Sequence, residues 1–128
     1  MQINIKTSGE NQAIVTQLTK KLTGGTKENV IARIALGYSL STGKRFTQQE
    51  FSAYDSQGKE YKDHILFDGQ YRDFYIALIC QAYGITKNDE LIPKYIKQHI
   101  DHGLEKINYL FENNPQYTFF DFLTEYFI

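Results

Sequence analysis

His99 and His102 are three residues apart on one predicted helix, with Asp101 and Glu105 close by. Imidazole and carboxylate groups at this spacing can bind a metal such as zinc. Both histidines overlap the apolar stripe of that helix, however, and no cysteine or supporting motif accompanies them. We therefore interpret them as partly buried structural histidines, and we predict no metal site and no cofactor.

Two other features could support catalysis. Asp63 and His64 are adjacent and could act as a carboxylate and a general base. Neither a nucleophile nor a second carboxylate is placed to complete that site. Cys80 lies within an apolar run and is expected in the core. We predict no catalytic residue, and therefore a protein that is not an enzyme.

The charged residues are distributed unevenly along the chain. Residues 1–45 carry seven lysines and arginines against two acidic residues, a net charge of +5. Residues 46–128 carry seven against thirteen, a net charge of −6, so the whole-chain value of −1 conceals the difference. The basic half suggests contact with a polyanion, and the acidic half suits protein contacts.

The candidate DNA-binding residues are basic residues of the segment 1–45, a helix-capping threonine, and two lysines of the connector (46–69). Phosphate contacts from such residues are independent of base sequence and sensitive to salt. Thr26 and the free amides of the helix that follows would add an anion-binding end. Any single lysine can also be an ordinary solvated residue, and Arg33 can be an ion-pair partner in an oligomer interface. The full set is Lys20, Lys21, Thr26, Lys27, Arg33, Lys44, Arg45, Lys59 and Lys62.

Length and composition predict one globular domain. A chain of 128 residues, 41% hydrophobic and 15% aromatic, can bury a core without disulfides or metals. Its single cysteine excludes an internal disulfide and is typical of a reducing compartment. The polar N-terminus lacks the apolar segment of a signal peptide, and no apolar run approaches the length of a membrane span. We expect a soluble, cytoplasmic protein with no membrane contact.

The first 45 residues have the element order of a ribbon-helix-helix module. Ile3 and Ile5 alternate with polar residues, which predicts a short strand with one buried face. Ser8 can cap a helix that ends at the glycine pair 24–25, and Thr26 can cap a second helix over 27–40. So short a strand is unstable alone, and in this motif a second copy of the chain supplies its partner.

The rest of the chain is predicted to be helical after a connector. A third helix, 71–84, is apolar on nearly every side at its centre, which indicates burial in a core or in an oligomer interface. A fourth helix, 89–111, carries an apolar stripe, and an aromatic, acidic tail can form a short terminal helix. The predicted fold is mainly α: a short N-terminal β-strand followed by helices, ribbon-helix-helix-like, with additional C-terminal helices. We divide the single domain, 1–128, into a basic segment (1–45), a connector (46–69), two core helices (70–111) and the tail (112–128).

Three segments together resemble the DndE family, from the bacterial system that places sulfur in the DNA backbone as phosphorothioate. They are TGGTKENVIARIALGYSLS, YDSQGKEYKDHILFDGQYRD and FYIALICQAYG. The likeness lies in their order and spacing, over residues 7–106 at the widest. Ala32 stands where family members often have cysteine, so no redox role is carried over. The tail beyond about residue 113 is outside the resemblance.

The resemblance implies a mostly helical, ribbon-helix-helix-like protein that assembles as a homo-oligomer, a tetramer. It also implies binding of double-stranded DNA, with nicked duplex preferred, by a non-catalytic subunit. The sulfur chemistry would belong to other subunits of the Dnd machinery: a cysteine desulfurase, an iron–sulfur protein and ATP-using subunits.

We therefore expect a DNA-binding accessory subunit of a DNA phosphorothioate modification system. A first alternative is a ribbon-helix-helix repressor or antitoxin that reads bases with the polar strand residues Gln2, Asn4 and Lys6. A second alternative is a metal-dependent nuclease that makes the nick itself.

Overall fold

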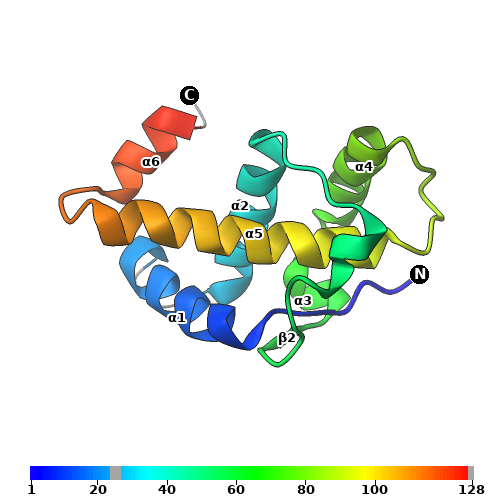
Figure 1. The fold of residues 1–128 in the computed structure, drawn as a ribbon, viewed down its shortest axis with the longest axis horizontal. Helices are drawn as coiled ribbons and strands as arrows, with labels where there is room; N and C mark the ends of the chain where they lie inside the picture. The colour runs from blue at the N-terminus through cyan, green and yellow to red at the C-terminus, as the bar shows by residue number, and fades with distance from the viewer. Residues whose placement is uncertain (24–26, 127–128) are drawn as a thin grey trace.

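The computed structural model describes residues 1–23 and 27–126 of the chain and is mainly helical (Figure 1). In chain order the elements are β1 (Ile5–Lys6), α1 (Gly9–Thr23), α2 (Glu28–Ser41), the 3-10 helix η1 (Gln48–Ser52), β2 (Glu60–Tyr61), α3 (Asp63–Leu66), α4 (Arg72–Tyr83), α5 (Ile92–Asn113) and α6 (Phe119–Tyr126). The predicted class, a short N-terminal strand followed by helices, is confirmed. The ribbon-helix-helix likeness is not.

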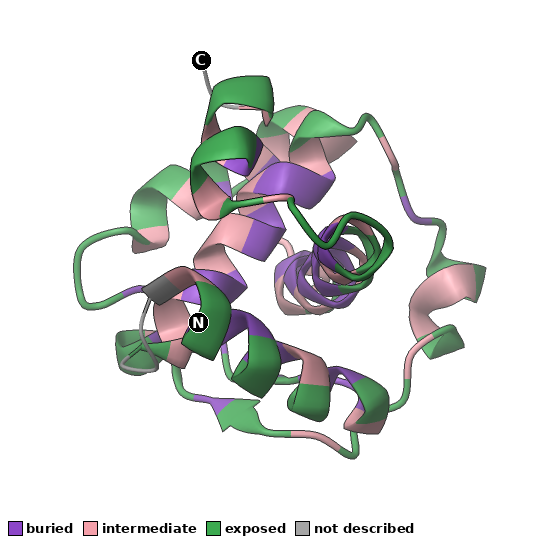
Figure 2. Cartoon of the chain, turned by 90° about the vertical axis from the view of Figure 1, so that its left-hand side faces the viewer, coloured by how far each residue is buried: buried purple, intermediate pink, exposed green. Residues whose placement is uncertain are grey.

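Helix α5 is the central element, and the other helices pack around it. Figure 2 looks nearly along α5 and shows buried residues on the sides that face its neighbours. Pro93 lies in its first turn, where a missing amide donor costs nothing. The predicted apolar stripe is confirmed, because its isoleucines are fully buried: Ile92, Ile96, Ile100 and Ile107.

Helices α2 and α5 cross closely. Gly103 of α5 faces the main chain of Ala35 of α2, so that a Cβ on Gly103 would lie 2.6 Å from the Ala35 carbonyl carbon. Ala32, Ala35 and Leu36 of α2 are fully buried. Small side chains at the crossing allow this close approach, and larger neighbours fill the core on either side.

Helix α1 begins as predicted. The amide of Asn11 donates to Ser8 Oγ at 3.2 Å, which is the hydrogen bond of an N-terminal cap. The predicted end of α1 at the glycine pair, and the predicted capping role of Thr26, lie outside the described residues.

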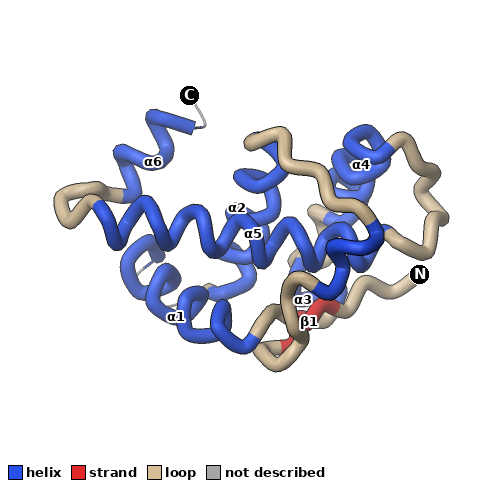
Figure 3. The backbone as a smooth tube through the Cα atoms, viewed as in Figure 1, coloured by secondary structure: helices blue, strands red, loops and turns tan. Residues whose placement is uncertain are grey.

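Strand β1 finds its partner inside the chain. It pairs with β2 in antiparallel register, Ile5 opposite Tyr61 and Lys6 opposite Glu60 (Figure 3 shows β1 in red). A second copy of the chain is therefore not needed to pair this strand, which corrects the expectation from the ribbon-helix-helix motif. The connector that supplies β2 also forms a helix that the sequence did not predict, α3.

Helix α4 ends at Gly84, which adopts a left-handed conformation with φ +64°. Of its residues, only Ile76 and Ile79 are buried, and Phe74 is 60% exposed. The apolar centre of this helix is therefore not enclosed by the chain's own core. Cys80, which was predicted in the core, is half-buried and packs against the edge of the core.

The C-terminal tail folds back onto the core as α6. Phe122 is fully buried, and its ring lies 5.4 Å from that of Tyr38 on α2. The ring of Tyr126 meets Tyr38 edge-on at 4.9 Å. The predicted terminal helix is therefore present, and its aromatic side chains cover the chain's own core.

Candidate nucleic-acid interface

Three predicted DNA-binding lysines from two segments line one open hollow. Lys27 precedes α2, whereas Lys59 and Lys62 flank β2, and together they border a hollow of about 490 Å³. Glu28, Asn29, Glu60, Tyr61 and Ile65 complete its lining. We call this feature the lysine hollow. Its lining has three lysines and two glutamates, and so carries a net positive charge.

The close approach of the connector to β1 positions Lys59. The amide of Thr7 donates to the carbonyl of Lys59 at 3.2 Å, and the amide of Gly58 donates to that of Thr7 at 2.8 Å. A Cβ on Gly58 would lie only 2.8 Å from the Thr7 carbonyl oxygen. A residue without a side chain is therefore required here, directly before Lys59.

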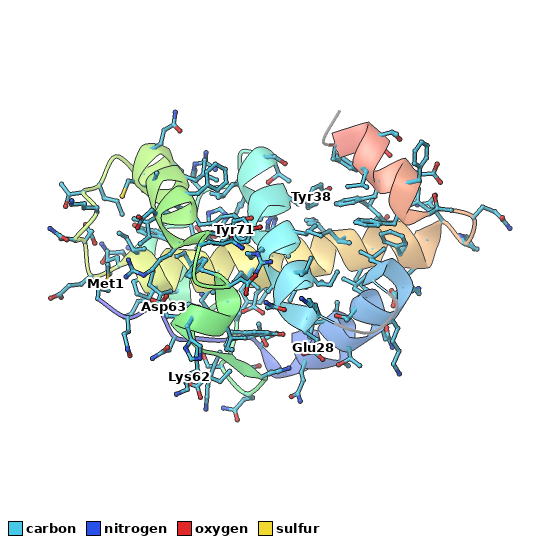
Figure 4. The ribbon with its side chains drawn as sticks, turned by 180° about the vertical axis from the view of Figure 1, so that it is seen from behind. Met1, Glu28, Tyr38, Lys62, Asp63 and Tyr71 are labelled. Atoms are coloured by element: carbon cyan, nitrogen blue, oxygen red, sulfur yellow. The ribbon has the colours of Figure 1, made fainter. Side chains whose placement is uncertain are left out.

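Ion pairs orient two of the three lysines. Lys59 Nζ lies 2.7 Å from Glu28 Oε2, and Lys62 Nζ lies 3.3 Å from Glu60 Oε1. Tyr61 OH donates to Glu28 Oε2 at 3.4 Å, and burial, followed by the charge of Glu28, raises the pKa of this phenol. Figure 4 labels Glu28 and Lys62 near the lower edge of the molecule in that view.

Lys27 is different from the other two lysines. It is exposed, and it has no ion-pair partner among the described residues. Its ammonium group is therefore available to an anionic ligand, together with the free amides at the start of α2.

Lys20 and Lys21 lie in the last turn of α1 and are exposed. A cation at a helix C-terminus interacts favourably with the helix dipole. Neither lysine has an ion-pair partner within the described part of the chain. Lys21 also lines a separate hollow with Glu112 and the loop before α6.

Arg33 is held by contacts inside the chain. Its Nη1 donates to the carbonyl of Leu66 at 2.7 Å, and its guanidinium lies 4.7 Å from the centre of the Tyr71 ring. These contacts attach the α3–α4 turn to α2. Arg33 thus has a packing role within one chain, and the phosphate contact or interface ion pair that we predicted for it stays a prediction.

Lys44 and Arg45 lie beyond the other end of α2. Lys44 Nζ pairs with Glu50 Oε2 at 3.1 Å, and Arg45 Nη1 donates to the Lys44 carbonyl at 2.8 Å. A helix of 14 residues is roughly 21 Å long, so these two basic residues are separated from the lysine hollow by the length of α2. The structure therefore does not bring the whole predicted basic set together, and Thr26 lies outside the described residues.

A comparison with protein families decides where this chain belongs. The family model described as DndE, DNA sulphur modification protein, matches residues 4–114. The chain belongs to the DndE family. Membership assigns the protein to DNA sulfur modification. A search of curated proteins found no match.

No described helix of this DndE-family protein is long and apolar enough to cross a membrane. Among the residues that the structure describes, no group of three or more His, Cys, Asp or Glu side chains is arranged to hold a metal ion. The region matched by the family contains all of the elements that form the lysine hollow.

The histidine pair of the DndE-family chain belongs to a buried hydrogen-bond network. Ser39 Oγ lies 2.7 Å from Nδ1 of both His99 and His102, and Tyr83 OH lies 2.7 Å from His99 Nε2. The amide of Phe46 donates to Tyr83 OH at 2.9 Å. The network thus joins α2, α4, α5 and the loop before η1.

Burial keeps both imidazoles neutral. Desolvation, with smaller contributions from Arg45, His102 and Lys44, lowers the pKa of His99 to about 3. Desolvation also lowers the pKa of His102, helped by Lys106 and Lys44. Because Ser39 has one proton to donate, it can donate to only one imidazole and must accept from the other. The two histidines therefore have a structural role, as their overlap with the apolar stripe of the helix predicted.

Asp63 is also engaged structurally. Its Oδ2 accepts from Arg72 Nε at 3.0 Å and from the amide of Ile3 at 2.8 Å, which ties α4 and the N-terminal segment to α3. His64 is exposed on α3. Figure 4 shows Asp63 on the same side of the molecule as Met1.

Sequence reasoning missed the residues that orient the site. Glu28 is 31 positions from Lys59, and Ser39 is 60 from His99, so no local spacing could have revealed either pair. Asn29, whose side chain donates to the carbonyl of Ile65 at 3.0 Å, was missed for the same reason. The only sequence feature that pointed to this region was the resemblance of the connector to the DndE family.

Proposed function

We propose that this protein is a non-catalytic, DNA-binding accessory subunit of a DNA phosphorothioate modification system. It holds duplex DNA through the lysine hollow, with Lys20 and Lys21 extending the contact. The observation that carries the proposal is the convergence of Lys27, Lys59 and Lys62 on one hollow in a member of a DNA sulfur modification family.

The hollow suits phosphate oxygens rather than base edges. Each lysine ammonium has three N–H donors, so Lys59 and Lys62 retain donors beyond those that contact Glu28 and Glu60. Lysine contacts a phosphate as a point charge and carries no base information. Glu28 and Glu60 fix the lysine positions and at the same time moderate the local charge, which favours contact with a limited number of phosphates.

We further propose that the subunit works as a homo-oligomer, a tetramer, with nicked duplex as its preferred substrate. The exposed apolar side of α4 supports an oligomer: Phe74 is 60% exposed, and Leu78 lines a groove that Gly37 and Leu40 of α2 border. An exposed apolar surface of this kind usually marks a contact with another protein chain. Other Dnd subunits would bind the acidic second half of the chain.

Fluorescence anisotropy with intact, nicked and gapped duplexes of one sequence tests the proposal. We expect binding that varies little with base sequence, is tightest for nicked duplex, and weakens with salt at a slope of about −0.9 per phosphate contacted. A strong preference for one palindromic duplex would instead identify a base-reading repressor. Size-exclusion chromatography with light scattering measures the molar mass of the assembly. We expect Phe74→Asp to lower that mass, because the substitution places a charge on the exposed apolar side of α4.

The non-catalytic role has its own test. Supercoiled plasmid incubated with the protein and Mg²⁺ or Mn²⁺ should remain supercoiled. Nicking that disappears in the His102→Ala variant would show that the protein is a nuclease.

A further inference from the structure

A hollow distinct from the lysine hollow lies beside β1, and its chemistry differs from that of the lysine hollow. It has a volume of about 450 Å³ and is bordered by β1, by η1 with the loop that follows, by Glu60 of β2, and by the first turns of α5. The residues that matter for its chemistry are Lys6, Phe51, Lys94, Lys97 and Gln98. Hollows of this size that combine apolar surface with a few polar groups are typical of small-molecule sites.

Gln98 is the unusual residue of this hollow. It is 1% exposed, and its Nε2 donates to the carbonyl of Phe51 at 2.9 Å. Its Oε1 is buried and accepts no hydrogen bond in the described part of the chain. A buried amide oxygen without a partner is costly, so a ligand that donates an N–H to it gains a strong preference for this position.

The border of the hollow carries three lysines, Lys6, Lys94 and Lys97, and one acidic residue, Glu60, so its net charge is positive. Lys6 and Lys94 are exposed and have no ion-pair partner within the described residues. Lys97 is paired with Asp101 and donates to the Asp55 carbonyl at 2.8 Å, so it is held in place. Lys94 and Gln98 are one helical turn apart on α5, which places a cation and the amide on one face.

Phe51 supplies an aromatic surface between these polar groups. It is half-buried, its ring packs edge-on against Tyr95 at 5.1 Å, and Lys94 Nζ lies 5.8 Å from its centre. A planar heterocycle can pack on such a ring, with cations close enough for an attached phosphate.

We propose that this hollow binds a nucleotide. The base packs against Phe51 and donates an N–H to Gln98 Oε1, and the phosphate contacts Lys6 and Lys94. The same chemistry is offered by a free nucleotide and by the terminal nucleotide of a nucleic-acid strand. The site uses none of the three lysines of the lysine hollow, and so it does not depend on the duplex-binding proposal.

Isothermal titration calorimetry on the full chain tests the site with AMP, adenosine, inorganic phosphate and a short 5′-phosphorylated oligo(dA). We expect AMP to bind about tenfold or more tightly than adenosine or phosphate alone, because each of these two probes lacks one of the two contacts. Binding of the oligonucleotide but not of AMP identifies a strand end as the source of the nucleotide. Absence of binding to both, or equal binding of phosphate and AMP, overturns the proposal.

Two variants locate the binding. Lys6→Ala with Lys94→Ala, and separately Gln98→Leu, should each weaken AMP binding by about tenfold or more. The control, Lys87→Ala with Lys106→Ala, removes two exposed lysines that do not line this hollow and should leave affinity within about twofold. Unchanged affinity in the lysine variant overturns the proposal even if Gln98→Leu fails to fold.

A third variant separates the two proposals. Replacing Lys27, Lys59 and Lys62 by alanine should leave AMP binding intact, whatever its effect on duplex DNA. Amide chemical-shift changes on AMP addition should centre on Lys6, Phe51, Lys94 and Gln98. Changes centred on the lysine hollow instead would overturn the assignment.

Discussion

Gly103 of α5 lies against the main chain of Ala35 of α2, with room for a hydrogen but not for a methyl group. A Cβ at Gly103 would come within 2.6 Å of the Ala35 carbonyl carbon, and backbone atoms on both sides leave neither helix able to yield locally. This contact sets the separation of the two helices that pack most extensively in the molecule. It therefore determines where α2 presents its N-terminal end, and with it Lys27 and Glu28, to the connector.

Gly103→Ala should destabilise the fold by about 1–3 kcal/mol or more, because the added methyl overpacks a close helix crossing. Urea denaturation measures the effect. Gly37→Ala is the matched control, since a Cβ at Gly37 of α2 meets nothing within 4 Å. Alanine is the better helix former, so the control should be neutral or more stable by up to about 1 kcal/mol. Equal effects of the two changes would contradict the crossing as described.

Stability should fall as the pH drops below about 6.5. His99 has a pKa of about 3 when folded and an ordinary value of 6.5 when unfolded. Below pH 6.5 the unfolded chain binds a proton at this histidine and the folded chain does not. The free energy of unfolding therefore falls by up to about 1.4 kcal/mol per pH unit. His102 adds to this loss in the same direction.

Urea denaturation at pH 7.5, 6.0 and 5.0 measures this dependence above the range where carboxylates titrate. His99→Gln should lower stability at pH 7.5 and flatten the dependence. His64→Gln, on the exposed surface of α3, should leave the profile unchanged. A wild-type profile that is level over this range would show that the buried network tolerates a charge.

Phe122→Ala should cost about 3–5 kcal/mol, because its fully buried ring packs on Tyr38 and Phe111. Phe120→Ala is the control on the same helix, since Phe120 is 73% exposed. Its effect should stay within about 0.5 kcal/mol. Thermal denaturation followed by circular dichroism distinguishes the two. Similar melting temperatures would mean that α6 contributes little to the core.

Alanine at Lys27, Lys59 and Lys62 together should weaken duplex binding and reduce the salt slope by up to about 0.9 for each phosphate that the variant no longer neutralises. Alanine at Lys87 and Lys106 is the control, since these exposed lysines lie outside the hollow. Anisotropy titrations at several salt concentrations give both affinity and slope. An unchanged slope in the triple variant would place the DNA elsewhere.

Glutamate at both Lys20 and Lys21 should weaken DNA binding without changing the oligomer mass, because both lysines are exposed in the last turn of α1. Gel-shift and light-scattering measurements on the same preparation test both statements. Binding that survives this reversal at low salt would show that the DNA-binding surface does not extend from the lysine hollow to α1.

Several elements were predictable because their signals are local. The spacing of the isoleucines in α5 and the capping serine before α1 depend on residues within one or two turns of each other. The connector was less predictable. Its two-residue strand and four-residue helix, α3, are too short to show a period.

The basic set shows the same limit. The sequence offered Arg33 as a phosphate contact or an interface ion-pair partner. It did not reveal that Leu66 and Tyr71, more than 30 positions away, contact this side chain in the fold. Lys6 was considered only for reading bases, and its place beside Gln98 was not predictable. Such pairings depend on how helices cross, which periodicity does not specify.

The amino-acid sequence by itself determined the mainly helical class, the unequal charge of the two halves and the likeness to the DndE family. These depend on composition, on short-range periodicity and on the order of motifs. Only the tertiary structure decided which lysines share a hollow, that β1 pairs within the chain, and that the histidines join a buried network. The physical reason is that each of these is a contact between segments distant in sequence, made possible where glycines at 58 and 103 allow two backbones to meet.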